Sequence, residues 1–470
     1  MHLFSTTSPR EEPAVVRPSI ALLTLVVASS LAAQTPQHTP APPKVTVIHA
    51  AHMFDGASDK LSGPVTVTVT NGRITAVAPG TSNSPGAEVI ELGDQTLMPG
   101  LIDVHKHMGG APSLGMNPFQ SRLTISDFET AIGASAMARK LLLEGFTTVR
   151  NVGSTGGVDL ALKRDIDRGW IPGPRIIVSL EPLSVSGGHS DPRNGIDPDW
   201  TNSTWGNSVA DGPEAFAKAV REHRRRGAEV IKIMPSGGVL SIGDDPKVQT
   251  MTDAEIKSAI DTAHNLGLKV AAHAHGKAAI DSAVRNGVDS IEHGTYADAE
   301  SFELMKQHGT YLVPTLLVAD QVHELALHHP EQLNPSAAQK ALEVTPLMKG
   351  MLGAAYKAGV KIAFGTDTSR GANAHEFTLM VSAGMTPADA LFAATRNAAD
   401  LVSMTGSAGC LRSGCFADMI AVNGNPLDDI TTMEHVQWVM KGGTVYKRDG
   451  QPVAQPVPAG AFIEGADMDE

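Results

Sequence analysis

Five short stretches of the chain place histidine, lysine or aspartate within or directly after an apolar run. They are Val104-His105-Lys106-His107, Val230-Ile-Lys232-Ile-Met234, Val270-Ala-Ala-His273-Ala-His275, Ile291-Glu-His293-Gly294 and Phe364-Gly-Thr-Asp367. Imidazole and carboxylate groups are preferred ligands of zinc and related divalent metals. Several imidazoles converging with a carboxylate make a poor apolar core and a good metal site. We therefore predict a metal site built from His105, His107, His273, His293 and Asp367.

His105 and His107 lie two residues apart in the first of these stretches. On a strand, side chains two apart point the same way, so both imidazoles would face one cavity and Lys106 would face away. A lone His-x-His pair arises often by chance. It gains weight here because His273, His293 and Asp367 stand at the ends of three further apolar stretches.

Lys232 stands inside an apolar run, where an ammonium group is costly to bury without a partner. One interpretation is that Lys232 snorkels to solvent or pairs with a carboxylate. An ammonium would, however, add positive charge beside two divalent cations. Carboxylation by carbon dioxide would instead give a negative carbamate, whose two oxygens can bridge two metal ions. The charge balance favours the carbamate.

The middle of the chain alternates short apolar runs with helical patterns. The expected strands are Leu101–Val104, Thr147–Asn151, Arg175–Val178, Val230–Ile233, Val270–His273, Ser290–Glu292, Tyr311–Val313 and Ile362–Phe364. The expected helices include Asp253–Leu266, Gly276–Asn286, Asp298–His308 and Ala337–Lys357. Eight such strands predict an α/β fold, a (β/α)8 TIM barrel whose chemistry collects at the carboxyl ends of its strands. An open doubly wound sheet is the alternative, but no GxGxxG motif follows the first strand.

Strand-like patterns also occur near both ends of the chain. Residues Val65–Thr70 alternate with period two, and Asn71-Gly72 is a strong hairpin signal. Similar patterns return at Asp418–Val422 and Trp438–Met440. We expect a small β-sandwich domain built from both termini. Its segments would be residues 45–97 and 406–455, with the barrel domain at 98–405.

The outer segments predict an exported protein. Arg10 and Arg17 precede the apolar run Ile20–Leu31, which is followed by small residues and is short for a membrane span. We expect a cleavable signal peptide (residues 1–33), a Pro-rich linker (34–44), an acidic tail (456–470), and a periplasmic or secreted location without a stable membrane span after cleavage. An uncleaved anchor is the alternative for the first segment. In an oxidising compartment Cys410 and Cys415 could form a disulfide or remain separate thiols.

Composition limits the partners. The formal net charge is −13, aromatic residues make up 4% of the chain, and no basic run is long enough to follow a phosphate backbone. These features exclude nucleic acid as the main partner. We expect a small-molecule substrate and, from the general tendency of soluble enzymes, a homo-oligomer.

The five motifs in order resemble the amidohydrolase superfamily. They are most similar to its binuclear branch, which is related to Xaa-Pro and Xaa-Arg dipeptidases and to fungal ochratoxin hydrolase. The matching stretches are Met98–His107, Val230–Gly238, His273–Gly276, Ile291–Thr295 and Gly365–Asp367, within a likeness that runs from about Val45 to Tyr446. The loop Gly187–Trp200 departs from the family pattern, so the resemblance leaves the specificity unassigned.

The resemblance implies two divalent metal ions, zinc by default. His105, His107 and Asp367 would hold one ion, His273 and His293 the other, and N6-carboxylated Lys232 would bridge them. Asp367 would also shuttle a proton. His189, in Gly187-Gly-His-Ser190, matches the position that polarises the substrate, and His275 matches a tyrosine or histidine that contacts it; a structural role stays open for both.

The implied activity is cleavage of an amide or peptide bond by metal-activated hydroxide. The substrate would be a small carboxylate-bearing molecule such as a dipeptide, an N-acyl amino acid or an ochratoxin-like amide. The alternatives are a lactonase or phosphotriesterase-like hydrolase and a cyclic-amide hydrolase similar to imidazolonepropionase. Relatives of the last kind generally use one metal and lack the strand-four lysine, so Lys232 weighs against that alternative.

Overall fold

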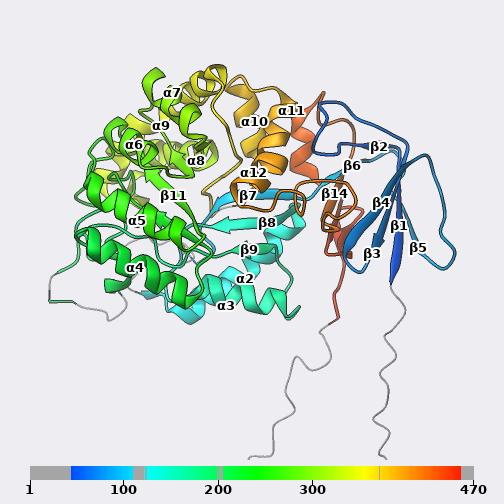
Figure 1. The fold of residues 1–470 in the computed structure, drawn as a ribbon, viewed down its shortest axis with the longest axis horizontal. Helices are drawn as coiled ribbons and strands as arrows, with labels where there is room; N and C mark the ends of the chain where they lie inside the picture. Colours follow the sequence, from blue (N-terminus) through cyan, green and yellow to red (C-terminus); the bar gives the residue numbers. More distant parts are fainter. Residues whose placement is uncertain are drawn as a thin grey trace, which may run out of the picture. The chain divides into compact units, whose positions relative to one another are not determined.

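The computed structural model describes residues 44–109, 121, 124–197, 199–200, 205–369 and 371–456 (Figure 1). The predicted signal peptide lies outside the described residues, as do all but the last residue of the linker and all but the first residue of the acidic tail. In the described part of the chain, no helix combines the length and the apolar character needed to cross a membrane.

Two parallel sheets form the centre of the α/β fold. One contains β7 (Leu101–Lys106), β8 (Phe146–Asn151) and β9 (Arg175–Ile177). The other contains β10 (Val230–Ile233), β11 (Lys269–Ala274), β12 (Ser290–His293) and β13 (Tyr311–Val313). Seven of the eight expected strands are therefore present, each within two residues of its predicted ends.

The prediction of an eighth regular strand at Ile362–Phe364 is wrong. Ile362 forms a single parallel bridge with Leu312, and the Val104 N–H donates to the Phe364 carbonyl over 2.9 Å. The Phe364 N–H instead donates to the carbonyl of Ala393, over 3.0 Å. Because this N–H is used by a helical segment, the ladder does not continue.

Helices lie around the parallel strands (Figure 1). They are α2 (Asp127–Leu143), α3 (Val158–Asp167), α4 (Pro213–Arg226), α5 (Asp253–Asn265), α6 (Lys277–Arg285), α7 (Ala299–His308), α8 (Leu316–His328), α9 (Pro335–Ala358), α10 (His375–Ser382), α11 (Pro387–Phe392) and α12 (Ala398–Leu401). The four helices predicted by range are confirmed within two residues. A capping box between Thr252 and Glu255 begins α5, which explains why its start was visible in the sequence.

Helix α8 was not predicted. Thr315, at its start, has a left-handed backbone and makes no side-chain cap. The Glu376 carboxyl of α10 instead accepts the N–H groups of Leu316 and Leu317 over 2.9 and 2.6 Å. A cap supplied by a residue sixty positions away leaves no local start signal.

Two further sheets use segments from both ends of the chain. The first has the order β4-β3-β1-β5 and the second β17-β16-β15-β14-β6-β2. Their strands are β1 (Val45–Ala50), β2 (His52–Met53), β3 (Val65–Thr70), β4 (Arg73–Pro79), β5 (Glu88–Glu91), β6 (Thr96–Pro99), β14 (Met419–Val422), β15 (Trp438–Lys441), β16 (Thr444–Arg448) and β17 (Gln451–Pro452). Antiparallel pairing of β6 with β14 joins the two ends.

The two antiparallel sheets share one apolar cluster. Val67, Leu97, Met419 and Trp438 belong to it, and each is at most 2% exposed. Between β3 and β4 the predicted Asn71-Gly72 turn is confirmed, with positive φ at both residues. Cys410 and Cys415 form a disulfide beside this cluster.

Candidate active site

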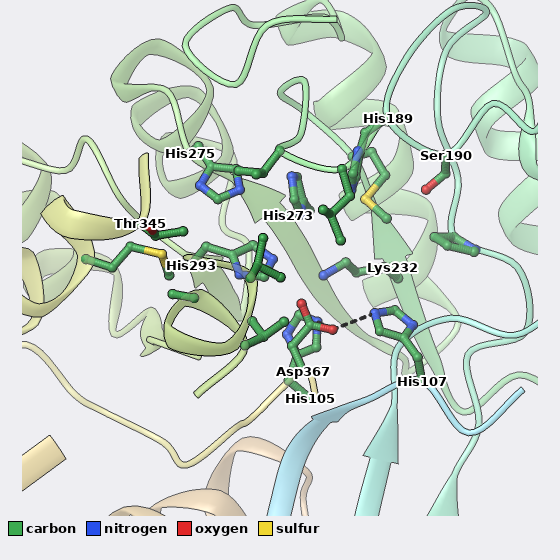
Figure 2. Close-up of a pocket in the computed structure, with 18 residues that line it drawn as sticks. His105, His107, His189, Ser190, Lys232, His273, His275, His293, Thr345 and Asp367 are labelled. Atoms are coloured by element: carbon green, nitrogen blue, oxygen red, sulfur yellow. Dashed lines mark ion pairs between the residues drawn. The ribbon is translucent and has the colours of Figure 1, made fainter. Parts of the chain in front are cut away.

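A cavity of about 200 Å³ opens at the carboxyl ends of the parallel strands (Figure 2). Every residue predicted to belong to the site lines it: His105, His107, His189, Lys232, His273, His275, His293 and Asp367. The structure therefore brings together side chains from separate strands and loops. Lys106 does not line this cavity; it is buried, and its Nζ donates to the Thr368 carbonyl.

The strand ends fix the orientation of these side chains. His293 and Asp367 have left-handed backbones, with φ of 72° and 55°, which are uncommon for residues other than glycine. The Asp367 N–H donates to the His105 carbonyl over 2.9 Å. Gly365 permits this approach, since a Cβ there would lie 2.8 Å from His105 Cβ. The backbone thus holds Asp367 beside the end of β7.

Two groups of candidate metal ligands face each other across the cavity. His105, His107 and Asp367 form one group, and His273, His275 and His293 form the other; within each, the ligand atoms lie within 4.8 Å of one another. Asp367 Oδ1 is 3.2 Å from His107 Nε2 and 3.6 Å from His105 Nε2.

The Lys232 amine lies between the two groups (Figure 2). The side chain is 1% exposed, and Nζ has no hydrogen-bond partner. Burial lowers the pKa of Lys232 to about 8, although the Glu292 and Asp367 carboxylates raise it in part. A buried polar atom without a partner is uncommon in folded proteins and requires an explanation. Two nitrogen-rich groups around an orphaned amine fit a pair of divalent ions and a carbamate.

Burial favours the neutral form of four imidazoles of the site, those of His105, His273, His275 and His293. It lowers the pKa of His105 to about 4 and that of His275 to about 3, and it lowers the pKa values of His273 and His293 well below their usual range. Burial acts to raise the pKa of Asp367, but the neighbouring histidines hold it far below its ordinary value. Neutral imidazole and ionised carboxylate are the forms that bind metal.

Contacts outside the cavity orient three of the histidines through their Nδ1 atoms. Nδ1 of His105 is 2.7 Å from Glu292 Oε2, that of His293 is 2.7 Å from Thr315 Oγ1, and that of His107 is 3.2 Å from the Gly153 carbonyl. This leaves each Nε2 for the cavity, as is usual for histidines that bind metal. His273 differs, because its Nε2 lies 3.4 Å from the Gly237 carbonyl.

Glu292 and Arg150 form a buried ion pair beneath His105. Arg150 donates to Glu292 over 2.8 Å, and its Nε donates to the Val104 carbonyl over 2.6 Å. Sequence reasoning gave neither residue a role. The signal was present, because Arg150, like Lys232, is a charged residue within a predicted strand.

The remaining lining of the cavity forms a largely apolar wall. Its members come from the strand ends, the loop after β10, α8 and α9: Pro182, Met234, Val239, Leu240, Val318, Ala319, Val322 and Met348. His189 stacks on His273 and His275 stacks on His293, with ring centroids 4.2 and 4.9 Å apart. Burial lowers the pKa of His189 to about 4.

Comparison with known proteins gives consistent matches. A model of the amidohydrolase family matches residues 96–446. The ochratoxinase of Aspergillus niger is 34% identical over 438 residues, covering 87% of this chain and 88% of that protein. A solved Xaa-Pro dipeptidase with bound methionine in its active site is 36% identical, with a TM-score of 0.82, covering 86% of this chain and 100% of its own. A prolidase complexed with N-methylphosphonate-L-proline is 33% identical, with a TM-score of 0.80 and coverage of 86% and 100%.

Proposed function

This chain belongs to the amidohydrolase family and is a hydrolase of amide or peptide bonds, and on that premise we propose that it uses two divalent metal ions bridged by N6-carboxylated Lys232. The proposed substrate is a small carboxylate-bearing amide: a dipeptide, an N-acyl amino acid or an ochratoxin-like amide. The similar proteins described as ochratoxinase, Xaa-Pro dipeptidase and prolidase support this class.

The buried, unpartnered amine of Lys232 carries the proposal. In the neutral form its nitrogen attacks carbon dioxide, an N–C bond forms, and the amine proton is released. The resulting carbamate removes the positive charge and provides two oxygens. Because the amine lies between the two ligand groups, one oxygen can serve each group (Figure 2).

The remaining ligands divide between the two ions. His105, His107 and Asp367 would hold one ion, and His273 and His293 the other. Zinc is proposed from the ligand types. Bound at these positions, the ions would polarise the substrate carbonyl and supply an activated water as nucleophile.

The chain's own groups would then move protons and hold the substrate. The Asp367 carboxylate would accept a proton from the attacking water and deliver it to the leaving nitrogen. His189 and His275, whose rings both contact His273, would contact the scissile group, and one of them would stabilise the developing oxyanion. The apolar wall would limit access of bulk water.

We also propose that the parallel strands close into a barrel. The Leu183–Ile233 bridge links the segment after β9 to β10, and residues 362–364 link β13 to β7. The shared apolar cluster supports a β-sandwich of residues 45–97 and 406–455. Periplasmic or secreted location and homo-oligomeric assembly remain part of the proposal.

A hydrolysis screen tests the function. Metal-loaded protein in bicarbonate would be offered N-acyl amino acids, Xaa-Pro and Xaa-Arg dipeptides and ochratoxin-like amides, with Asp367→Asn as the inactive control. We expect at least one amide to be cleaved by the wild type and none by the variant. Turnover confined to lactones or phosphotriesters, or activity with one metal ion per chain on cyclic amides, would favour the alternatives.

A further inference from the structure

We propose that Ser241 and Asp244 are positioning residues for His189 and present its Nε2 atom to bound substrate. The inference rests on the proposed function, because it assigns a role within the same cavity. Both residues belong to the loop between β10 and α5, which sequence reasoning did not connect with His189.

A chain of short hydrogen bonds leads from the cavity to a buried carboxylate. His189 Nδ1 lies 2.8 Å from Ser241 Oγ, which lies 2.5 Å from Asp244 Oδ1. The Asp244 side chain is 2% exposed. His189 lines the cavity with its side chain 20% exposed, and its Nδ1 is taken up by the Ser241 contact. Nε2 is therefore the atom of the ring that can meet a substrate.

The chemistry of the three groups sets the direction of these bonds. An ionised carboxylate only accepts, so the single proton of Ser241 goes to Asp244. The Ser241 oxygen then accepts the Nδ1–H of His189. In the neutral ring this leaves a lone pair on Nε2, which suits a donor group on the substrate. The oxyanion role left open between His189 and His275 accordingly falls to His275.

Lys340 of α9 holds the loop in place. Its ammonium group donates to the Gly238 and Ser241 carbonyls, each over 2.7 Å, and to Asp244 Oδ1 over 3.1 Å. The Gly238 N–H donates to the other Asp244 oxygen over 3.0 Å. The Asp244 carboxylate is thus paired with the Lys340 ammonium group, and each of its two oxygens accepts a hydrogen bond that fixes its orientation.

Close packing leaves the His189 ring little freedom. One face stacks on His273 at a centroid distance of 4.2 Å. A Cβ added at Gly238 would lie 2.0 Å from His189 Nδ1, so only glycine fits beside the ring. The loop between β10 and α5 therefore fixes the position of the His189 ring, and the Ser241 hydroxyl selects which way round the ring lies.

Kinetics of loop variants tests the proposal. Ser241→Ala and Asp244→Asn should each lower kcat/KM by about 10–100-fold with unchanged metal content, the usual effect of losing a group that orients an active-site side chain. Ser241→Thr keeps the hydroxyl and should recover most of the activity. Asp245→Asn is the matched control, because this neighbouring carboxylate is exposed and accepts the Lys247 N–H in a local turn.

A double-mutant experiment with His189 distinguishes a role of Ser241 in positioning that ring from a general role in stabilising the loop. In a His189→Ala background, Ser241→Ala should cause no further loss, because the two residues act as one unit. Crystal structures of the wild type and Ser241→Ala provide a second measurement that needs no substrate. In the wild type we expect the hydrogen bond between Ser241 and His189. In the variant we expect the His189 ring to be rotated or to occupy two alternate conformations.

The proposal would be overturned if the His189 ring kept its orientation in Ser241→Ala. It would also be overturned if Ser241→Ala lowered kcat/KM by the same factor in the His189→Ala background as in the wild type. If the wild type cleaves no amide, the proposed function fails, and the ring orientation still decides the role of Ser241.

Discussion

Two regions of the molecule place a lysine in an apolar strand and use it differently. In the cavity, Lys232 is 1% exposed and its amine has no partner. In β15, Lys441 is partly exposed and donates to the Gly173 carbonyl over 2.7 Å. Burial lowers the pKa of each to about 8. A lowered pKa is therefore not what distinguishes the site; an unpartnered amine between the two groups of candidate metal ligands is.

The surroundings of the two lysines extend this contrast. Around Lys232 the interior is filled with ionisable groups, including the Arg150–Glu292 pair. The cluster beside β15 is apolar, with Leu97 and Trp438 fully buried. The first interior is suited to binding and chemistry, and the second to stability. Substitutions in the two regions should therefore separate activity from folding.

The largest separation is expected from Lys232→Met against Lys441→Met. Lys232→Met should lower amide hydrolysis by about 10³-fold, because loss of the bridge weakens metal catalysis worth several kcal/mol. Its free energy of unfolding without metal should stay equal or rise, since an unpartnered polar group is removed. Lys441→Met should keep the wild-type activity, and its free energy of unfolding should fall by about 1 kcal/mol. Turnover, metal content and urea unfolding measure both.

Glu292→Gln should affect activity and stability together. Arg150 would keep a buried charge without its carboxylate, which costs about 3–5 kcal/mol of unfolding free energy. His105 would lose its charged partner, and kcat/KM should fall by about 10–100-fold. Glu303→Gln, which removes an exposed pair with Lys306, should cost less than about 1 kcal/mol. Equal effects of the two substitutions would contradict the assigned role of Glu292.

Leu97→Ala should affect stability alone. The side chain is fully buried in the cluster shared by the two antiparallel sheets, and its truncation should cost about 2–5 kcal/mol. Turnover per folded molecule should not change. Urea unfolding combined with active-site titration checks this, and reduced turnover in the folded fraction would show that the two regions are coupled.

The smallest effect is expected from Cys410→Ser combined with Cys415→Ser. The disulfide closes a loop with a sequence separation of 5, so its removal should cost about 2 kcal/mol by the loop-entropy estimate. Hydrolysis should be unchanged, since neither cysteine lines the cavity. Thermal unfolding of the double variant against the oxidised wild type measures the difference.

The sequence predicted the elements whose signals are local. Period-two alternation at Val65–Thr70, the Asn71-Gly72 turn and the capped start of α5 were all visible. The segment Ile362–Phe364 was wrong as a strand because the Ala393 carbonyl takes the Phe364 N–H. That competition between segments distant in sequence has no local signature.

The site divides in the same way. His105, Lys232 and Asp367 could be identified because each follows or interrupts an apolar run, and strand ends meet at one edge. Ser241 and Asp244 lie in a loop rich in small and polar residues, where such side chains are ordinary. Their link to His189 depends on the three-dimensional path of the loop.

The central claim concerns the chemical state of one nitrogen, and carbon-13 NMR examines it directly. Metal-loaded wild type and Lys232→Met would be equilibrated with ¹³C-bicarbonate at matched concentrations. We predict a protein-bound carbamate resonance in the wild type, two metal ions per chain, and neither in the variant. A wild type that binds two ions and hydrolyses amides without that resonance would contradict the account.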